Sequence, residues 1–155
     1  MKYASLGSIS SGTLLAADLL DTFSDELEHH VQANAEEWCS DAGRAARDAH
    51  MRLIGEAREL DMETDSDETA DTASDLVDAL SDALGEFAAP YTYFGAHEGD
   101  GADFGYWPSW DAIEDLPQVE DGDEAKALGE DCRFVNDHGN VTIYGGDGSV
   151  IWDCV

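Results

Sequence analysis

Six carboxylates recur at helical spacing near the middle of the chain. Steps of three and four residues bring side chains to one face of an α-helix, and each turn of helix would then add a rung about 6 Å from the last. Such a row is suited to pairing with ammonium or guanidinium groups. We call these six residues the acidic ladder: Asp67, Asp71, Asp75, Asp78, Asp82 and Glu86.

The charge around the ladder is unusual for a helix surface. Residues 61–86 contain ten carboxylates and no basic residue. A solvated helix face ordinarily mixes signs, because acid–base neighbours stabilise a helix whereas like pairs cost about 0.2–0.5 kcal/mol each. Two interpretations stay open, a solvated face and a binding surface, and the missing bases favour the second.

The ladder requires a helix, which we predict over residues 65–88. Asp65 and Glu68 have capping-box spacing at its start, and Pro90 follows its end. An apolar stripe alternates with the acids and includes Leu76, Leu80 and Leu84. The pattern predicts a helix that packs on one side and carries carboxylates on the other.

The flanking segments predict an α+β fold. After Thr13, taken as an N-cap, apolar residues at steps of three and four predict one long helix or a helix pair over 13–60, interrupted near Asn34 or Gly43. Residues 91–155 are rich in aromatics and glycine. We therefore expect a single domain, residues 1–155, with long N-terminal amphipathic helices packed on a C-terminal antiparallel sheet of about four or five strands.

Within residues 91–155 we predict a hairpin, an acidic stretch and a meander. Two strands should meet at the Gly-Asp-Gly turn of residues 99–101, followed by a short helix and an acidic loop over 111–131. Three strands with glycine-containing turns should fill 132–155. The inward-facing candidates in the last two strands are Val141, Ile143, Val150 and Trp152.

Overall charge restricts the class of partner. Thirty-six acids oppose seven bases, giving a net charge of −29. Nucleic acid and anionic membrane are polyanions, so neither is expected as a direct partner, and a basic protein is. The sequence has neither an apolar run of spanning length nor a signal-peptide pattern, which favours a cytoplasmic protein. A homodimer through the long helical segment stays open.

The residues around the predicted hairpin turn are a second candidate site. His97, Glu98, Asp100 and Asp103 surround the hairpin turn, where a divalent cation or an acid–base pair is conceivable, although turn geometry explains the same residues. A small metal-dependent enzyme centred on His97 and Asp103 is thus a second alternative. No nucleophile or phosphate-loop motif is present, so we expect no enzyme and no cofactor.

Two further groups of residues are assigned to structure. The aromatic cluster from Tyr91 to Trp110 should pack the core and hairpin, because no basic residue accompanies it. The three cysteines fit neither a disulfide scaffold nor a CxxC metal site. Buried reduced thiols are favoured, and pairing of Cys132 with Cys154 stays open.

In size, charge and acidic helix, the chain resembles small acidic DNA-mimic inhibitors of phages and mobile elements, such as anti-restriction and anti-CRISPR proteins. The resemblance implies a class of partner, a cationic nucleic-acid-binding protein, and carries over no functional residue. We expect the ladder to stand in for phosphates. Further acids after the hairpin would add to it: Asp111, Glu114, Asp115, Glu120 and Asp121.

Halophilic adaptation is the first alternative, in a housekeeping or virion protein. Two Lys against five Arg, and 22 Asp against 14 Glu, fit a high-salt surface. A halophile would spread its acids, however, whereas ten fall in 61–86, twelve in 91–131 and only three in the last 24 residues. This asymmetry favours a functional face.

A salt titration separates these two interpretations. If the acids serve binding, the apolar stripes should keep the chain folded at ~0.1 M salt, where charges are screened only beyond ~10 Å. Circular dichroism across a salt series measures this directly. A folding transition that requires more than about 1 M salt would support halophilic adaptation instead.

Overall fold

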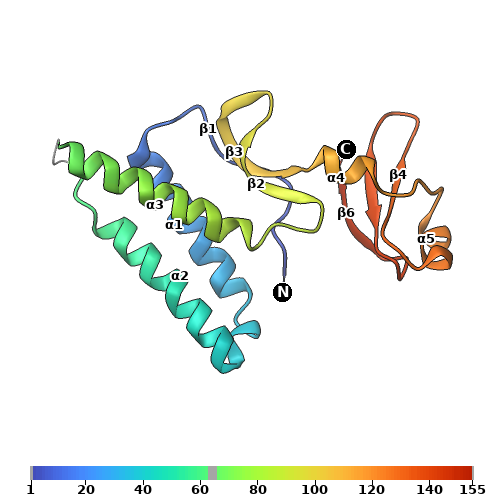
Figure 1. The fold of residues 1–155 in the computed structure, drawn as a ribbon, viewed down its shortest axis with the longest axis horizontal. Coiled ribbons are helices and arrows are strands. Elements are labelled where there is room, and N and C mark those ends of the chain that lie inside the picture. Colours follow the sequence, from blue (N-terminus) through green and yellow to red (C-terminus); the bar gives the residue numbers. More distant parts are fainter. Residues whose placement is uncertain (1, 63–65, 155) are drawn as a thin grey trace. The chain divides into compact units, whose positions relative to one another are not determined.

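The computed structural model describes residues 2–62 and 66–154 and has the predicted α+β class (Figure 1). It divides into two compact units, Met1–Ala88 with Tyr93–Trp107, and Ala89–Thr92 with Pro108–Val155. The first holds helices α1 (Ala16–Ala33), α2 (Asp41–Glu59) and α3 (Asp67–Gly85), the 3-10 turn η1 (Glu37–Cys39) and strand β1 (Gly7–Ser11). It also holds all but one end residue of each of the strands β2 (Thr92–His97) and β3 (Asp100–Pro108). The second holds α4 (Trp110–Glu114), α5 (Gly122–Leu128), β4 (Cys132–Val135), β5 (Val141–Tyr144) and β6 (Val150–Cys154).

The prediction of one sheet with four or five strands is wrong, because the strands form two three-stranded antiparallel sheets. Their orders are β1-β3-β2 and β4-β5-β6. Strand β1 comes from the N-terminal segment and pairs with β3, with Gly7 opposite Tyr106 and Ser11 opposite Asp103. Only Ser10 of β1 is buried, so the segment lacks the apolar alternation by which a strand is recognised.

The segment 13–60 forms a helix pair, one of the two predicted forms. Helix α1 ends at Ala33 with Asn34 as its C-cap, and the Trp38 indole donates to the Val31 carbonyl across the connection (2.8 Å). Ser40 caps α2 by accepting from the Gly43 N–H, so Gly43 lies within the helix rather than at the break. Thr13 is not the N-cap of α1. That position is Leu15, whose N–H donates to the Thr13 hydroxyl.

The predicted acidic helix is present as α3. Its N-cap is Ser66, whose hydroxyl accepts from the Thr69 N–H at 3.1 Å. The expected cap residue Asp65 lies outside the described residues. The helix ends at Gly85, ahead of Pro90, as the sequence indicates.

The three long helices pack against one another (Figure 1). Aromatic side chains join them to the first sheet. Phe23 of α1 is fully buried and meets the rings of Phe94 and Phe104 edge-on at 5.1 and 5.6 Å. Phe87, just after α3, is also fully buried. Burying rings of this size contributes a large share of the hydrophobic stabilisation. Core packing is therefore confirmed for Phe94, Phe104 and Tyr106 of the predicted cluster, whereas Trp110 is 41% exposed.

The second unit contains the predicted meander with one misplaced residue. Val141, Ile143 and Trp152 are buried, but Val150 is 54% exposed. The pairing shifts between Ile143 and Tyr144, so a bulge at this point breaks the alternation on which the prediction rested. The expected acidic loop is also partly wrong, because α5 forms within it and buries Ala125.

All three cysteines are unpaired. Cys132 lies opposite Tyr144, whereas Cys154 lies opposite Val141, three residues further along β5. That offset alone separates the two by roughly 10 Å along the strand direction, beyond the reach of a disulfide. Among the described residues, no helix is both long enough and apolar enough to cross a membrane.

Candidate acidic binding surface

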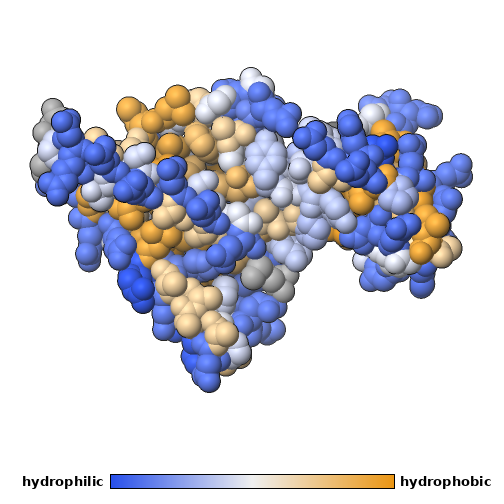
Figure 2. All heavy atoms as spheres, viewed as in Figure 1, coloured by the Kyte–Doolittle hydropathy of each residue, from blue (hydrophilic) through white to orange (hydrophobic). Residues whose placement is uncertain are grey.

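The acidic ladder lies on the solvent-facing side of α3. All six of its carboxylate residues are exposed, while Ala73, Leu80 and Leu84 on the opposite face are buried. Figure 2 shows hydrophilic side chains following the helix. The apolar stripe packs on α1 and α2, so contacts made by the core fix the position of every rung.

Five of the six rungs have no ion-pair partner within residues 2–62 and 66–154. The exception is Glu86, whose Oε2 lies 3.4 Å from Nε2 of the buried His50. Among the described residues, the carboxylates from Asp67 to Asp82 therefore form an open row. Glu86, the last rung, also contacts the buried His50 of α2.

Arginines of the same unit pair with other acids. Arg58 of α2 reaches Asp25 and Glu28 of α1 at 2.6 and 2.8 Å, and these two contacts raise the pKa of its guanidinium. Arg44 pairs with Asp41 and Arg47 with Asp48, both within α2. Among the described residues, arginines of this unit thus pair with four carboxylates on α1 and α2 and with none on α3.

The five further candidate acids belong to the second unit, and all are exposed. Asp111 and Glu114 lie on α4, and Asp115 is its C-cap. Asp121 has a local structural role as N-cap of α5, accepting from the Glu124 N–H at 3.0 Å. Glu120 directly precedes this cap. Their participation in binding stays a prediction, and the site described here is built on α3.

The hairpin residues are engaged in turn geometry. The turn lies at Glu98–Gly99, slightly ahead of the predicted position, and His97 Nδ1 accepts from the Gly99 N–H at 3.0 Å. The His97 ring packs edge-on against Trp107, and Asp103 accepts from the Ser8 hydroxyl. Across the described part of the chain, no group of three or more His, Cys, Asp or Glu side chains is arranged to hold a metal ion.

Sequence reasoning missed two buried imidazoles next to Phe87. His30 stacks on the Phe87 ring at 4.8 Å, and His50 lies 5.8 Å from it. His30 Nε2 is also 3.0 Å from Glu26 Oε1; this contact lowers the pKa of Glu26 although partial burial opposes the shift. The i, i+4 spacing of Glu26 and His30 was the available signal.

Comparisons with protein-family models, curated proteins and solved structures gave no match to this chain.

Reversing two rungs should stabilise the protein. Asp71→Lys with Asp78→Lys turns four of the five neighbouring ladder pairs from repulsive to attractive, which should raise the free energy of unfolding by about 2–4 kcal/mol. Urea denaturation measures the change. Glu36→Lys with Glu98→Lys is the matched control, because it alters net charge equally at exposed positions outside the regular helices. A ladder variant no more stable than this control would show that rung repulsion is negligible.

Proposed function

We propose that this protein is a non-enzymatic DNA mimic that occupies the nucleic-acid-binding groove of a basic host protein. In this proposal the partner is a nuclease or a restriction or CRISPR complex, and the inhibitor acts in the host cytoplasm. The ladder carboxylates pair with the Lys and Arg side chains that otherwise hold phosphates.

One observation carries the proposal: five successive rungs are exposed and have no ion-pair partner within residues 2–62 and 66–154, while arginines of the same unit pair with acids elsewhere. A row maintained only for solubility would gain stability from interspersed bases. The absence of basic residues along α3 therefore supports selection of these carboxylates for binding an external cationic partner.

Ladder dimensions support a groove as the target. From Asp67 to Glu86 the helix extends about 28 Å, a length over which one DNA strand presents roughly eight phosphates. Six carboxylates are sparser than that, so short-range pairing has to be supplemented by long-range attraction. A net charge of −29 supplies it, since complementary fields raise association rates and make them sensitive to salt.

The test is competition against DNA on a captured partner. Proteins retained from host lysate are identified, and the basic one is loaded with labelled DNA. Wild-type protein should displace the DNA, and Asp71→Lys with Asp78→Lys should require at least a tenfold higher concentration, because each reversed rung repels the groove. Glu86 is left unchanged because of its contact with His50.

The control variant Glu36→Lys with Glu98→Lys separates the ladder from net charge. It should compete within about twofold of wild type, since it keeps every rung. Equal losses in both variants would mean that total charge, not the ladder, drives association. Undiminished competition by the ladder variant would exclude α3 as the binding surface.

A further inference from the structure

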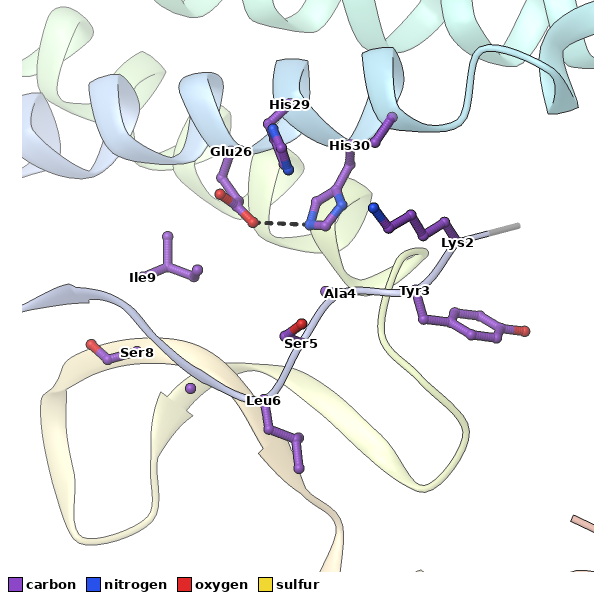
Figure 3. Close-up of a pocket in the computed structure, with 12 residues that line it drawn as sticks. Lys2, Tyr3, Ala4, Ser5, Leu6, Ser8, Ile9, Glu26, His29 and His30 are labelled. Atoms are coloured by element: carbon purple, nitrogen blue, oxygen red, sulfur yellow. Dashed lines mark ion pairs between the residues drawn. The ribbon is translucent and has the colours of Figure 1, made fainter. Parts of the chain in front are cut away.

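A cavity of about 370 Å³ lies in the first unit between the N-terminal segment and α1 (Figure 3). Its lining consists of residues 2–9 on one side and Glu26, His29, His30 and Ala33 on the other. No residue of α3 lines it, so the cavity is separate from the acidic ladder. Its volume is suited to a small organic molecule.

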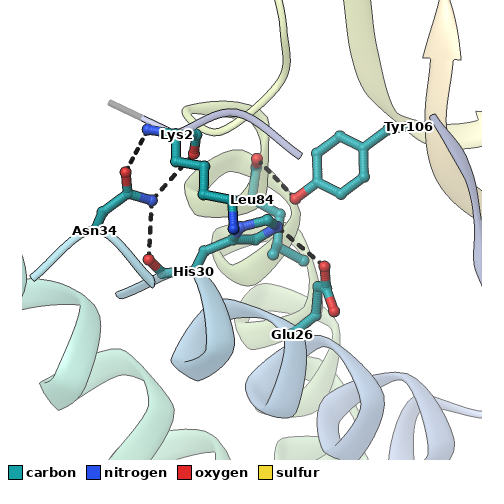
Figure 4. A network of polar contacts seen from close by, with 6 residues as sticks. All are labelled: Lys2, Glu26, His30, Asn34, Leu84 and Tyr106. Atoms are coloured by element: carbon teal, nitrogen blue, oxygen red, sulfur yellow. Dashed lines mark hydrogen bonds and ion pairs between the residues drawn. The ribbon is translucent and has the colours of Figure 1, made fainter. Parts of the chain in front are cut away.

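The cavity wall is held in place from both ends. The Asn34 side chain accepts from the Lys2 N–H and donates to the Lys2 carbonyl (Figure 4). The Ala4 N–H donates to the Phe87 carbonyl. Further along, Gly7 pairs with β3. The segment between these anchors is therefore a preformed wall, which lowers the entropic cost of binding.

Three basic side chains, Lys2, His29 and His30, line this cavity, although acidic residues predominate in the chain. Lys2 is one of only two lysines, and its side chain extends alongside His30 (Figure 3). Within the ranges that the structure describes, the Lys2 ammonium has no carboxylate partner, although acids outnumber Lys and Arg by 36 to 7. The one acid in the lining, Glu26, is already matched by His30 at 3.0 Å.

On the α1 side of the cavity, His30 is buried and packs against two neighbouring rings. Only 5% of this residue is exposed, and its ring stacks on Phe87 and meets Tyr106 edge-on at 5.7 Å. His29, next to it, is exposed and its ring lies 5.7 Å from that of His30. The cavity thus combines an ammonium without a carboxylate partner among the described residues, two imidazoles and the apolar side chains of Ile9 and Ala33.

We propose that this cavity binds a small organic monocarboxylate, with the carboxylate on Lys2 and His29 and the hydrocarbon part toward Ile9. One negative charge completes the pairing of the Lys2 ammonium. A second would meet Glu26, which favours a monoanion over a dianion such as phosphate at pH 8. The site is independent of the proposed DNA mimicry, because it shares no residue with the ladder.

Nuclear magnetic resonance of the His29 and His30 side chains tests this with acetate, propionate and butyrate, at ionic strength held constant with chloride. Saturable shifts are expected, with affinity rising at least twofold per added methylene because that group leaves water. Signals that follow ionic strength alone, affinity that ignores chain length, or tighter binding of phosphate at pH 8 would each overturn the assignment.

Two variants and a control identify the site. Lys2→Gln should weaken butyrate binding at least tenfold, the usual effect of losing one charged hydrogen bond, without lowering the melting temperature, because only the Lys2 backbone bonds to Asn34. Glu26→Gln should tighten binding severalfold, because it removes the one negative charge in the lining. Lys126→Gln, which alters the other lysine, should leave affinity unchanged. Equal losses from both lysine variants, or weaker binding in Glu26→Gln, would overturn the proposal.

Discussion

Burial of apolar side chains between α1, α2 and α3 is the interaction on which the rest of the structure depends. A chain with a net charge of −29 repels itself when compact, so its folding has to be driven by the core. Phe23, Leu27, Leu80, Leu84 and Phe87 are all fully buried there. Because the core fixes α3 from behind, the exposed face of that helix is free to carry charges that do nothing for folding.

Within the described residues, the ion pairs of Arg44, Arg47 and Arg58 lie on α1 and α2 and not on the exposed face of α3. Arg58 bridges α2 to Asp25 and Glu28 on α1, where a pair joins two elements of the fold. Exposed pairs of this kind contribute little, typically below about 1 kcal/mol, so their location matters more than their strength. At the C-terminal end of the ladder, Glu86 lies near His50 and marks the boundary between the open row and the packed helices.

Periodic features could be predicted from the sequence, and features that depend on distant partners could not. The acidic helix, the helix pair and the last three strands follow from spacing, because each pattern reflects one buried face. Strand β1 escaped prediction because its place in the sheet comes from pairing with β3 rather than from its own residues. Val150 was misplaced because a bulge breaks alternation without a sequence signal.

The features of the ladder and of the cavity also differ in whether the sequence predicts them. Exposure of the ladder could be predicted, since a helix with one apolar stripe turns its other face to solvent. The pairing of Arg58 with α1, the stacking of His30 on Phe87 and the cavity beside Lys2 could not. Each joins residues more than twenty positions apart, and nothing in their local spacing indicates the contact.

The most direct test of the central claim is to map the carboxylates that change when the captured partner binds. Carboxyl carbon resonances report each aspartate separately. If α3 is the binding surface, shifts are expected at Asp67, Asp71, Asp75, Asp78 and Asp82, with Asp25, which is paired with Arg58, unaffected. Shifts confined to the acids of α4 and α5, or small shifts spread evenly over all carboxylates, would contradict a binding surface on α3.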